Sequence, residues 1–257
     1  MLRKRIIPKI LVRKTGDNYS AVVSRNFDRF ITVGNALSQF RIMDSNKADE
    51  ISIINLHRGG SSPVSEFSRT LSKLVEASST PISAGGGIKS ILDADTFMKT
   101  GIEKISIPIY ADASNLFLFE YISNRYGKQA VQATFDYSLS ESSYTIRRSQ
   151  SKLNLDELSA LIRSYLNSGA GEIVITNMEK DGARAGLDFS LLNLPSYGID
   201  VPILLSGGAH SADNFVEAFR AGADGVVSGT YMAKMDQSLL QLRSKIAVYD
   251  INVRRIK

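Results

Sequence analysis

The sequence predicts an α/β protein, a closed (β/α)8 barrel in which residues 1–257 form a single domain. Eight short apolar segments alternate with amphipathic segments, which predicts strands that pair in parallel through right-handed crossovers. A glycine-rich motif occurs twice, and no linker rich in proline, glycine or serine divides the chain. Eight strand–helix units in 257 residues fit the usual size of such a barrel.

The repeated glycine motif predicts a duplication of half-barrels, at about residues 1–120 and 122–242. The sequence Gly85-Gly86-Gly87 in the first half corresponds to Gly207-Gly208 in the second, and Gly86 and Gly207 lie 121 positions apart (207 − 86). Other pairs keep nearly the same offset: Ser90 with Ser211, Gly101 with Gly222, and residues 48–60 with 170–182.

The apolar segments predict strands at residues 6–12, 51–56, 81–84, 104–107, 131–136, 172–177, 202–206 and 225–228. The amphipathic segments predict helices at residues 35–46, 65–77, 90–100, 115–126, 155–168, 190–194, 211–221 and 237–247. Ser90 is the expected N-cap of its helix, and Gly101 is its expected stop. The polar stretch 137–152 is expected to form a long loop or hairpin over the top face of the barrel.

The composition excludes several classes of protein. The chain has no cysteine, so disulfides, thiolate catalysis and cysteine-based metal sites are excluded. His57 and His210 are too few for a histidine-rich metal site and are expected in loops, and no metal or cofactor is expected. The net charge of +5 comes from scattered basic residues, which favours a solvated surface over a nucleic-acid interface. No apolar run approaches the roughly 18 residues of a membrane span, so a cytoplasmic protein without membrane partners is expected.

Both glycine motifs fall at the carboxyl ends of predicted strands, where a barrel of this kind carries its chemistry. Glycine lets the backbone approach an anion, and the amides at the start of the next helix are hydrogen-bond donors. Gly86 and Gly87 therefore predict one phosphate site. A second site is predicted at Gly207 and Gly208, closed by Asp181, Gly182, Gly229 and Thr230. Tight barrel turns without a ligand are the alternative.

Charged residues mark both ends of the predicted barrel. Asp136 ends the fifth strand and is a candidate general acid or base, with a loop-capping role as the alternative. Four charged residues stand at strand starts on the barrel floor: Arg5, Glu50, Lys104 and Glu172. Two cations and two anions at one end predict a ring of ion pairs, and such a ring is usually structural because buried charges need partners.

With these motifs the chain resembles the cyclase subunit (HisF) of imidazole glycerol phosphate synthase over nearly its whole length. The matching segments are 4–8, 85–88, 104–107, 169–173, 181–182 and 206–209. The resemblance implies a barrel that receives ammonia from a glutaminase (HisH-like) subunit docked at its floor. In the family, this ammonia cleaves and cyclises a bis-phosphorylated ribulosyl intermediate of histidine biosynthesis. The resemblance also implies that the four-residue ring is the ammonia gate and that Asp136 is one of two catalytic aspartates.

The departures from the family pattern gather at the top of the barrel. Leu11 stands in place of the other catalytic aspartate, and leucine can neither take nor give a proton. Four further family residues are replaced, at Val23, Asn55, Pro108 and Ala183. This pattern resembles the HisF-like branch associated with glycosyl amidation, which implies an ATP-dependent sugar amidotransferase as a further partner and an acetamidino sugar of a surface polysaccharide as the product. An altered cyclase and a non-catalytic scaffold for the glutaminase are the alternatives.

Overall fold

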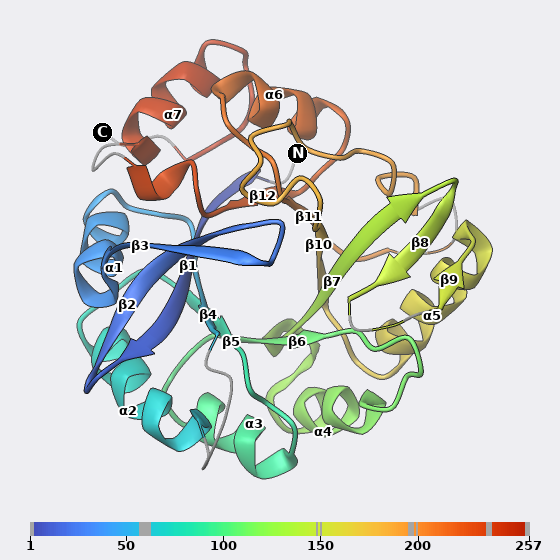
Figure 1. The fold of residues 1–257 in the computed structure, drawn as a ribbon, viewed down its shortest axis with the longest axis horizontal. Helices are drawn as coiled ribbons and strands as arrows, with labels where there is room; N and C mark the ends of the chain where they lie inside the picture. The colour runs from blue at the N-terminus through green and yellow to red at the C-terminus, as the bar shows by residue number, and fades with distance from the viewer. Residues whose placement is uncertain are drawn as a thin grey trace.

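The computed structural model describes residues 3–56, 63–147, 149, 151–194, 198, 200–234 and 238–254. Parallel strands form a closed barrel (Figure 1), which confirms the predicted fold class. These strands are β1 (Arg5–Thr15), β4 (Ile51–Asn55), β5 (Ile82–Gly85), β6 (Lys104–Pro108), β7 (Val131–Ser140), β10 (Glu172–Asn177), β11 (Ile203–Ser206) and β12 (Gly225–Ser228). The barrel closes where β12 pairs in parallel with β1, with Arg5 opposite Gly225.

Helices surround the barrel (Figure 1). They are α1 (Ala36–Ser45), α2 (Pro63–Glu76), α3 (Ile91–Met98), α4 (Leu116–Tyr126), α5 (Leu155–Asn167), α6 (Ala212–Arg220) and α7 (Ser238–Ala247), with short 3-10 helices η1 (Lys128–Ala130) and η3 (Met232–Lys234). Ser90 caps α3 as expected. The predicted helix at 190–194 is wrong: residues 190–193 form turns. Pro195 follows in the sequence, and proline disfavours helical backbone at the residue before it, which leaves this short segment too few residues for a stable helix.

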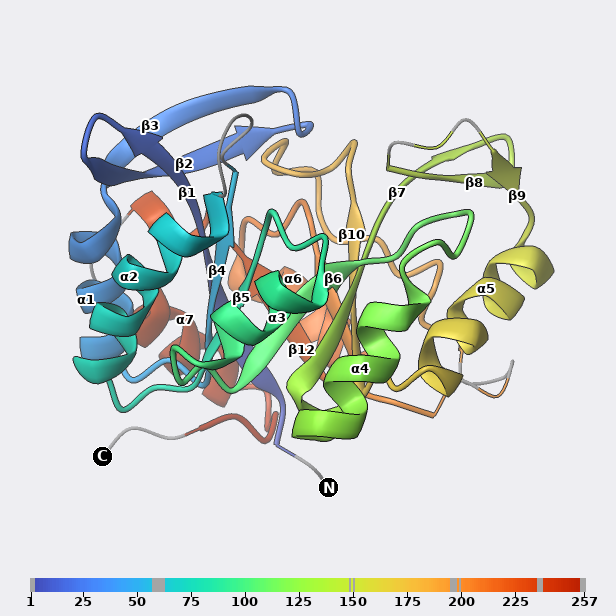
Figure 2. The ribbon, with the colours of Figure 1, turned by 90° about the horizontal axis from the view of Figure 1, so that it is seen from below.

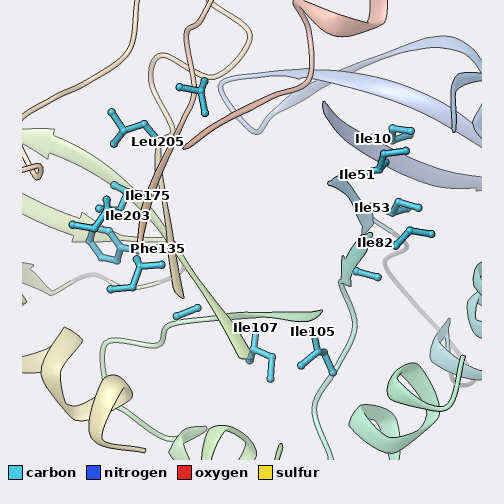
Figure 3. Packing of buried hydrophobic residues seen from close by; sticks show 14 of the residues in the cluster. Ile10, Ile51, Ile53, Ile82, Ile105, Ile107, Phe135, Ile175, Ile203 and Leu205 are labelled. Carbon is cyan, nitrogen blue, oxygen red and sulfur yellow. The ribbon is translucent and has the colours of Figure 1, made fainter. Parts of the chain in front are cut away.

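The hydrophobic core lies between the barrel and its helices. Figure 3 shows barrel-strand side chains such as Ile53, Ile105 and Phe135 in this layer. Side chains alternate between the two faces of a strand, so the residues between these core positions point into the barrel. A separate apolar cluster is formed there by Ile7, Val174, Leu204 and Val227, which come from four neighbouring strands.

Two antiparallel extensions rise from one end of the barrel (Figure 2). The first is the hairpin of β2 (Asn18–Arg25) and β3 (Arg29–Asn35), which pairs with the end of β1. The second continues β7 into β8 (Ser143–Ile146) and β9 (Lys152–Leu153). The hairpin predicted within 137–152 is thus confirmed, whereas β2 and β3 were not predicted. The two chain termini lie at the opposite end, the barrel floor (Figure 2).

Contacts at the start of two strands recur in the two halves of the barrel. The amide of Ile82 donates to Glu103 Oε2 at 2.6 Å, and the amide of Ile203 donates to Asp224 Oδ2 at 3.0 Å. Ile82 and Ile203 are 121 positions apart in the sequence, and so are Glu103 and Asp224. This is the same offset that separates Gly86 from Gly207. This agreement supports the half-barrel duplication, which stays a prediction until the halves are superposed. Among the described residues, no helix is both long and apolar enough to cross a membrane.

Candidate functional site

The four floor residues form the ring that the sequence predicts. Arg5 contacts Glu172 and lies 3.4 Å from Glu50 Oε2, while Lys104 Nζ lies 2.8 Å from Glu50 Oε2 and 2.9 Å from Glu172 Oε1. Each charge therefore has two partners of opposite sign. The carboxylates are buried and the cations partly so, with exposed side-chain fractions of 4% for Glu50 and 24% for Arg5. Burial alone would raise the pKa of Glu172, but Lys104 and Arg5 outweigh it and hold that pKa below its ordinary value.

At the opposite end, all six residues of the second predicted phosphate site line one pocket. These are Asp181, Gly182, Gly207, Gly208, Gly229 and Thr230. Gly207 has φ +91°, and a Cβ there would lie 2.6 Å from the carbonyl oxygen of Asn177, so only glycine fits the turn. The start of α6 follows, with Ser211 as its N-cap. The structure brings these residues together, and phosphate binding by them stays a prediction.

Two cations that the sequence interpretation missed stand beside this pocket. Arg184 lines the pocket directly, and its own backbone has φ +60°. Lys9 on β1 reaches past β12, with Nζ 3.0 Å from Ser206 Oγ on β11 and 3.7 Å from Asp181 Oδ1. Alternation along β1 could have indicated Lys9, because it lies on the same face as Leu11. The pocket thus has positive charge to match an anion.

The first glycine motif has the same backbone but a different helix cap. Gly86 has φ +100°, and a Cβ there would lie 2.1 Å from the carbonyl oxygen of Asn55. Asn55 thus limits the first motif as Asn177 limits Gly207 in the second. The Asp93 carboxylate accepts hydrogen bonds from the amides of Lys89 (3.1 Å) and Ser90 (3.0 Å) and from the Ser90 hydroxyl (2.8 Å). A carboxylate of the chain itself therefore already occupies donors at the start of this helix.

Gly87 in the first motif also has positive φ, +85°. Residues 57–62, which include His57, lie outside the described residues. His210, the other histidine, is exposed, and its amide donates to Asn214 Oδ1.

Asp136 projects from β7 at the mouth and is paired with an arginine. Arg147 Nη1, at the end of β8, lies 3.4 Å from Asp136 Oδ2. The guanidinium of Arg147 also stacks on the ring of Phe27, 4.7 Å from its centroid, at the tip of the β2–β3 hairpin. Burial raises the pKa of Asp136, and the positive charge of Arg147 opposes that shift. The pairing was not predicted, because it depends on the register of the β7–β8 hairpin, whose turn the sequence did not locate.

The β2–β3 hairpin also contacts the second anion pocket. The amide of Asn26 donates to the carbonyl oxygen of Asp181 at 2.8 Å, and the Ser24 hydroxyl contacts the Asp181 carboxylate. A Cβ at Gly182 would lie 1.9 Å from the carbonyl oxygen of Ser24. The hairpin therefore packs directly on the Asp181-Gly182 turn.

The positions that depart from the family pattern lie around the same mouth. Leu11 is on β1, opposite Ile54 of β4 and Val22 of β2. Asn55 ends β4. Pro108 ends β6, and its carbonyl oxygen accepts a hydrogen bond from Asn115. Val23 lies on β2, and Ala183 follows the Asp181-Gly182 turn. None of the five side chains can take up a proton as an aspartate does.

Comparison with known proteins identifies the family. A family model described as "Histidine biosynthesis protein" matches residues 5–236. The chain belongs to this family.

Curated HisF relatives match over nearly the whole chain. One from Prochlorococcus marinus (strain MIT 9313), named "Putative imidazole glycerol phosphate synthase subunit hisF2", is 32% identical over 96% of both chains. A protein of the same name from Campylobacter jejuni is 28% identical over 90% of both chains. "Imidazole glycerol phosphate synthase subunit HisF" of Bacillus subtilis (strain 168) is 28% identical over 99% of this chain and 100% of its own. The resemblance to HisF drawn from the motifs is thereby confirmed, and it extends to the hisF2 branch.

Proposed function

We propose that this HisF-family barrel is the subunit of a glutamine amidotransferase complex that receives ammonia at its floor and passes it through the barrel to the mouth. The partner at the floor is a glutaminase of the HisH type. The acceptor reaction makes an acetamidino sugar for a surface polysaccharide, with an ATP-dependent sugar amidotransferase. The observation that carries the proposal is the contrast between an intact ring on the floor and a mouth that lacks the family's acid–base pair.

The floor supports a conduit because its charged ring is complete. Arg5 and Lys104 each contact both Glu50 and Glu172, so the ring closes the N-terminal end of the barrel. A scaffold needs a surface for docking but no conduit, so the retained ring weakens the scaffold alternative.

The mouth supports a changed reaction because Asp136 has no carboxylate partner at the first strand. Leu11 occupies that position, and the loss of one member of an acid–base pair typically costs about 10²–10⁴-fold in rate. Asp136 is instead paired with Arg147. The assignment to sugar amidation rests on the resemblance of this set of losses to the glycosyl-amidation branch.

A second candidate is the cyclase reaction of imidazole glycerol phosphate synthase with altered catalysis. It is favoured by the names of the relatives and by the pocket around Gly207 and Thr230. The two candidates differ in their acceptors. With ammonia supplied, a cyclase turns over the bis-phosphorylated histidine intermediate, whereas the proposed complex replaces the oxygen of an N-acetyl sugar by an NH group, which mass spectrometry detects.

The conduit is tested by removing single members of the ring. In the complex, Arg5→Ala or Lys104→Ala should uncouple glutamine hydrolysis from acceptor amidation while the barrel stays folded. The matched control is Arg243→Ala, which breaks a buried ion pair with Asp49 (3.0 Å) that lies outside the ring. This control should lower the melting temperature and leave the coupling unchanged. Intact coupling in destabilised ring variants would remove the conduit and leave the scaffold.

A further inference from the structure

Arg147 stands where the two antiparallel extensions at the mouth come together. It directly follows β8, and its amide donates to the carbonyl oxygen of Asp136 at 2.8 Å, so the β7–β8 ladder fixes its backbone. Its guanidinium lies over the ring of Phe27, 4.7 Å from the centroid, at the tip of the β2–β3 hairpin. One extension therefore holds the base of this side chain, and the other holds its charged end.

The guanidinium has more donors than the protein uses. Within the described residues, its one hydrogen bond runs from Nη1 to Asp136 Oδ2, at 3.4 Å. Arginine carries five N–H groups, so four (5 − 1) have no protein partner in this part of the chain. The contact is also longer than the roughly 2.7–2.9 Å of a strong charge-assisted hydrogen bond. The Arg147 side chain is 28% exposed, so a ligand in the mouth can reach it.

Phe27 occupies a position that its own turn disfavours. Asn26 and Phe27 have φ of +54° and +58°, and the amide of Asp28 donates to the carbonyl oxygen of Arg25 at 3.1 Å. A turn of this kind favours glycine or asparagine at its two central positions, and a bulky side chain there is strained. The contact with Arg147 offsets this strain. The ring covers one face of the guanidinium and leaves the edge, which carries the N–H groups, open.

Asp136 does not depend on Arg147 alone. Burial raises the pKa of Asp136, and the charge of Arg147 opposes that shift. The charge of Lys9 and a hydrogen bond from the Thr176 side chain act in the same direction as Arg147. Both remain beside the carboxylate when Arg147 turns to a ligand. The pair can therefore separate without leaving an isolated buried charge, which would be strongly unfavourable.

We propose that Arg147 is an anion site of the mouth, separate from both glycine motifs, that binds the carboxylate or phosphate group of a ligand. The oxyanion accepts two N–H groups from the open edge of the guanidinium, a geometry that arginine provides and lysine does not. Nη1 exchanges its long contact with Asp136 for the ligand, while Phe27 keeps the guanidinium in place. Asp136 is thus an internal competitor that the ligand displaces. This site does not depend on the reaction proposed above.

The site is tested in the full chain with two simple anions. The chain has no tryptophan, so Phe27→Trp introduces a single fluorophore that keeps an aromatic ring against Arg147. Its emission is titrated with sodium acetate and with inorganic phosphate, with sodium chloride holding the ionic strength constant. Calorimetry on the chain that retains Phe27 repeats each titration without the reporter.

Arg147→Gln removes the proposed site. Arg13→Gln is the matched control, because Arg13 has the same charge and lies over Phe30 of the same hairpin, 6.0 Å from its centroid. Asp136→Asn removes the internal competitor and leaves Arg147 in place. For phosphate, the part of the binding that Arg147→Gln removes is assigned to this site, and the remainder to the glycine motifs.

Arg147→Gln should weaken anion binding about tenfold or more, the effect of one lost charge-assisted hydrogen bond. Arg13→Gln should leave the binding unchanged. Asp136→Asn should strengthen it by up to about fivefold, because the anion no longer competes with a carboxylate. A gain in affinity cannot come from misfolding. A site that binds acetate takes a carboxylate, and one that binds phosphate alone takes a phosphate group.

Three results would overturn the site. They are the absence of binding of either anion, an equal loss of affinity in Arg147→Gln and Arg13→Gln, and unchanged affinity in Asp136→Asn. Each would leave Arg147 as a clamp between the two extensions.

Discussion

The two glycine motifs predict anion sites of unequal strength, because the helices that follow them, α3 and α6, carry different residues at their third position. Asp93 and Asn214 are separated by the offset of the repeat, and each accepts backbone amides at the start of its helix. The first is a carboxylate and the second a neutral amide. Exchanging them, by Asp93→Asn and Asn214→Asp, should reverse the preference between the sites with little change in shape.

The size of the effect follows from the charge. Phosphate near neutral pH carries about −1.5 to −2 charges, and two unit charges about 7 Å apart interact by about 0.6 kcal/mol at the dielectric constant of water. The sum is about 1 kcal/mol, or about fivefold in affinity. The carboxylate also cancels part of the attraction between phosphate and the positive end of the helix dipole, and this loss is of similar size, about 0.3–1 kcal/mol. Asp93→Asn should therefore strengthen the first site about fivefold or more, and Asn214→Asp should weaken the second by the same factor.

Isothermal titration calorimetry with inorganic phosphate at low ionic strength measures both constants, and crystals soaked in sulfate show which site is filled. The wild-type protein should bind phosphate first at Gly207 and Gly208. Raising the salt concentration should shrink the difference between the variants, since exposed charges are screened. If Asp93→Asn leaves the first site unchanged, or if wild-type crystals fill only the first site, the electrostatic reasoning is refuted.

Three further outcomes are expected. Leu11→Asp alone should not restore cyclase turnover of the histidine intermediate, because other mouth residues are also replaced; a rate near that of HisF enzymes in a coupled assay would contradict this. Gly182→Ala should destabilise the protein by about 1–3 kcal/mol more than Gly16→Ala in urea titrations, because both have positive φ but only Gly182 faces a backbone oxygen, that of Ser24, at 1.9 Å. The lowered pKa of Glu172 stabilises the fold above its ordinary value of 4.5, and this stabilisation is lost as the pH falls through the lower folded value; melting curves should show this loss in wild type and not in Glu172→Gln.

The barrel could be predicted because its signal is local. Each buried strand is a short apolar run beside an amphipathic helix, and the structure places a strand at every predicted position. The β2–β3 hairpin was missed because its turn at Asn26 and Phe27 uses left-handed backbone on non-glycine residues, which gives no glycine signal. The segment at 190–194 was predicted as a helix, but it is too short for a stable one.

The site could be predicted in part for the same reason. The second pocket is built from short motifs at strand ends, which a barrel brings together by its geometry. The pair of Asp136 and Arg147 depends on the register of the β7–β8 hairpin, and the contact of Lys9 with Ser206 joins strands that are distant in sequence. Strand alternation indicates which way such residues point, but it does not indicate which partner they find.

Four ion pairs join the floor residues into a ring in which each residue has two partners, and this connectivity has a mechanical consequence. If any single ion pair separates, the remaining three still join Arg5, Glu50, Lys104 and Glu172 in an unbroken line. No member is then left as an isolated buried charge, which would cost about 3–5 kcal/mol. In an isolated ion pair neither residue has a second partner, so separation leaves both charges unpaired. The base of this barrel can therefore part on one side at a time and re-form, whereas two independent ion pairs would each have to break completely.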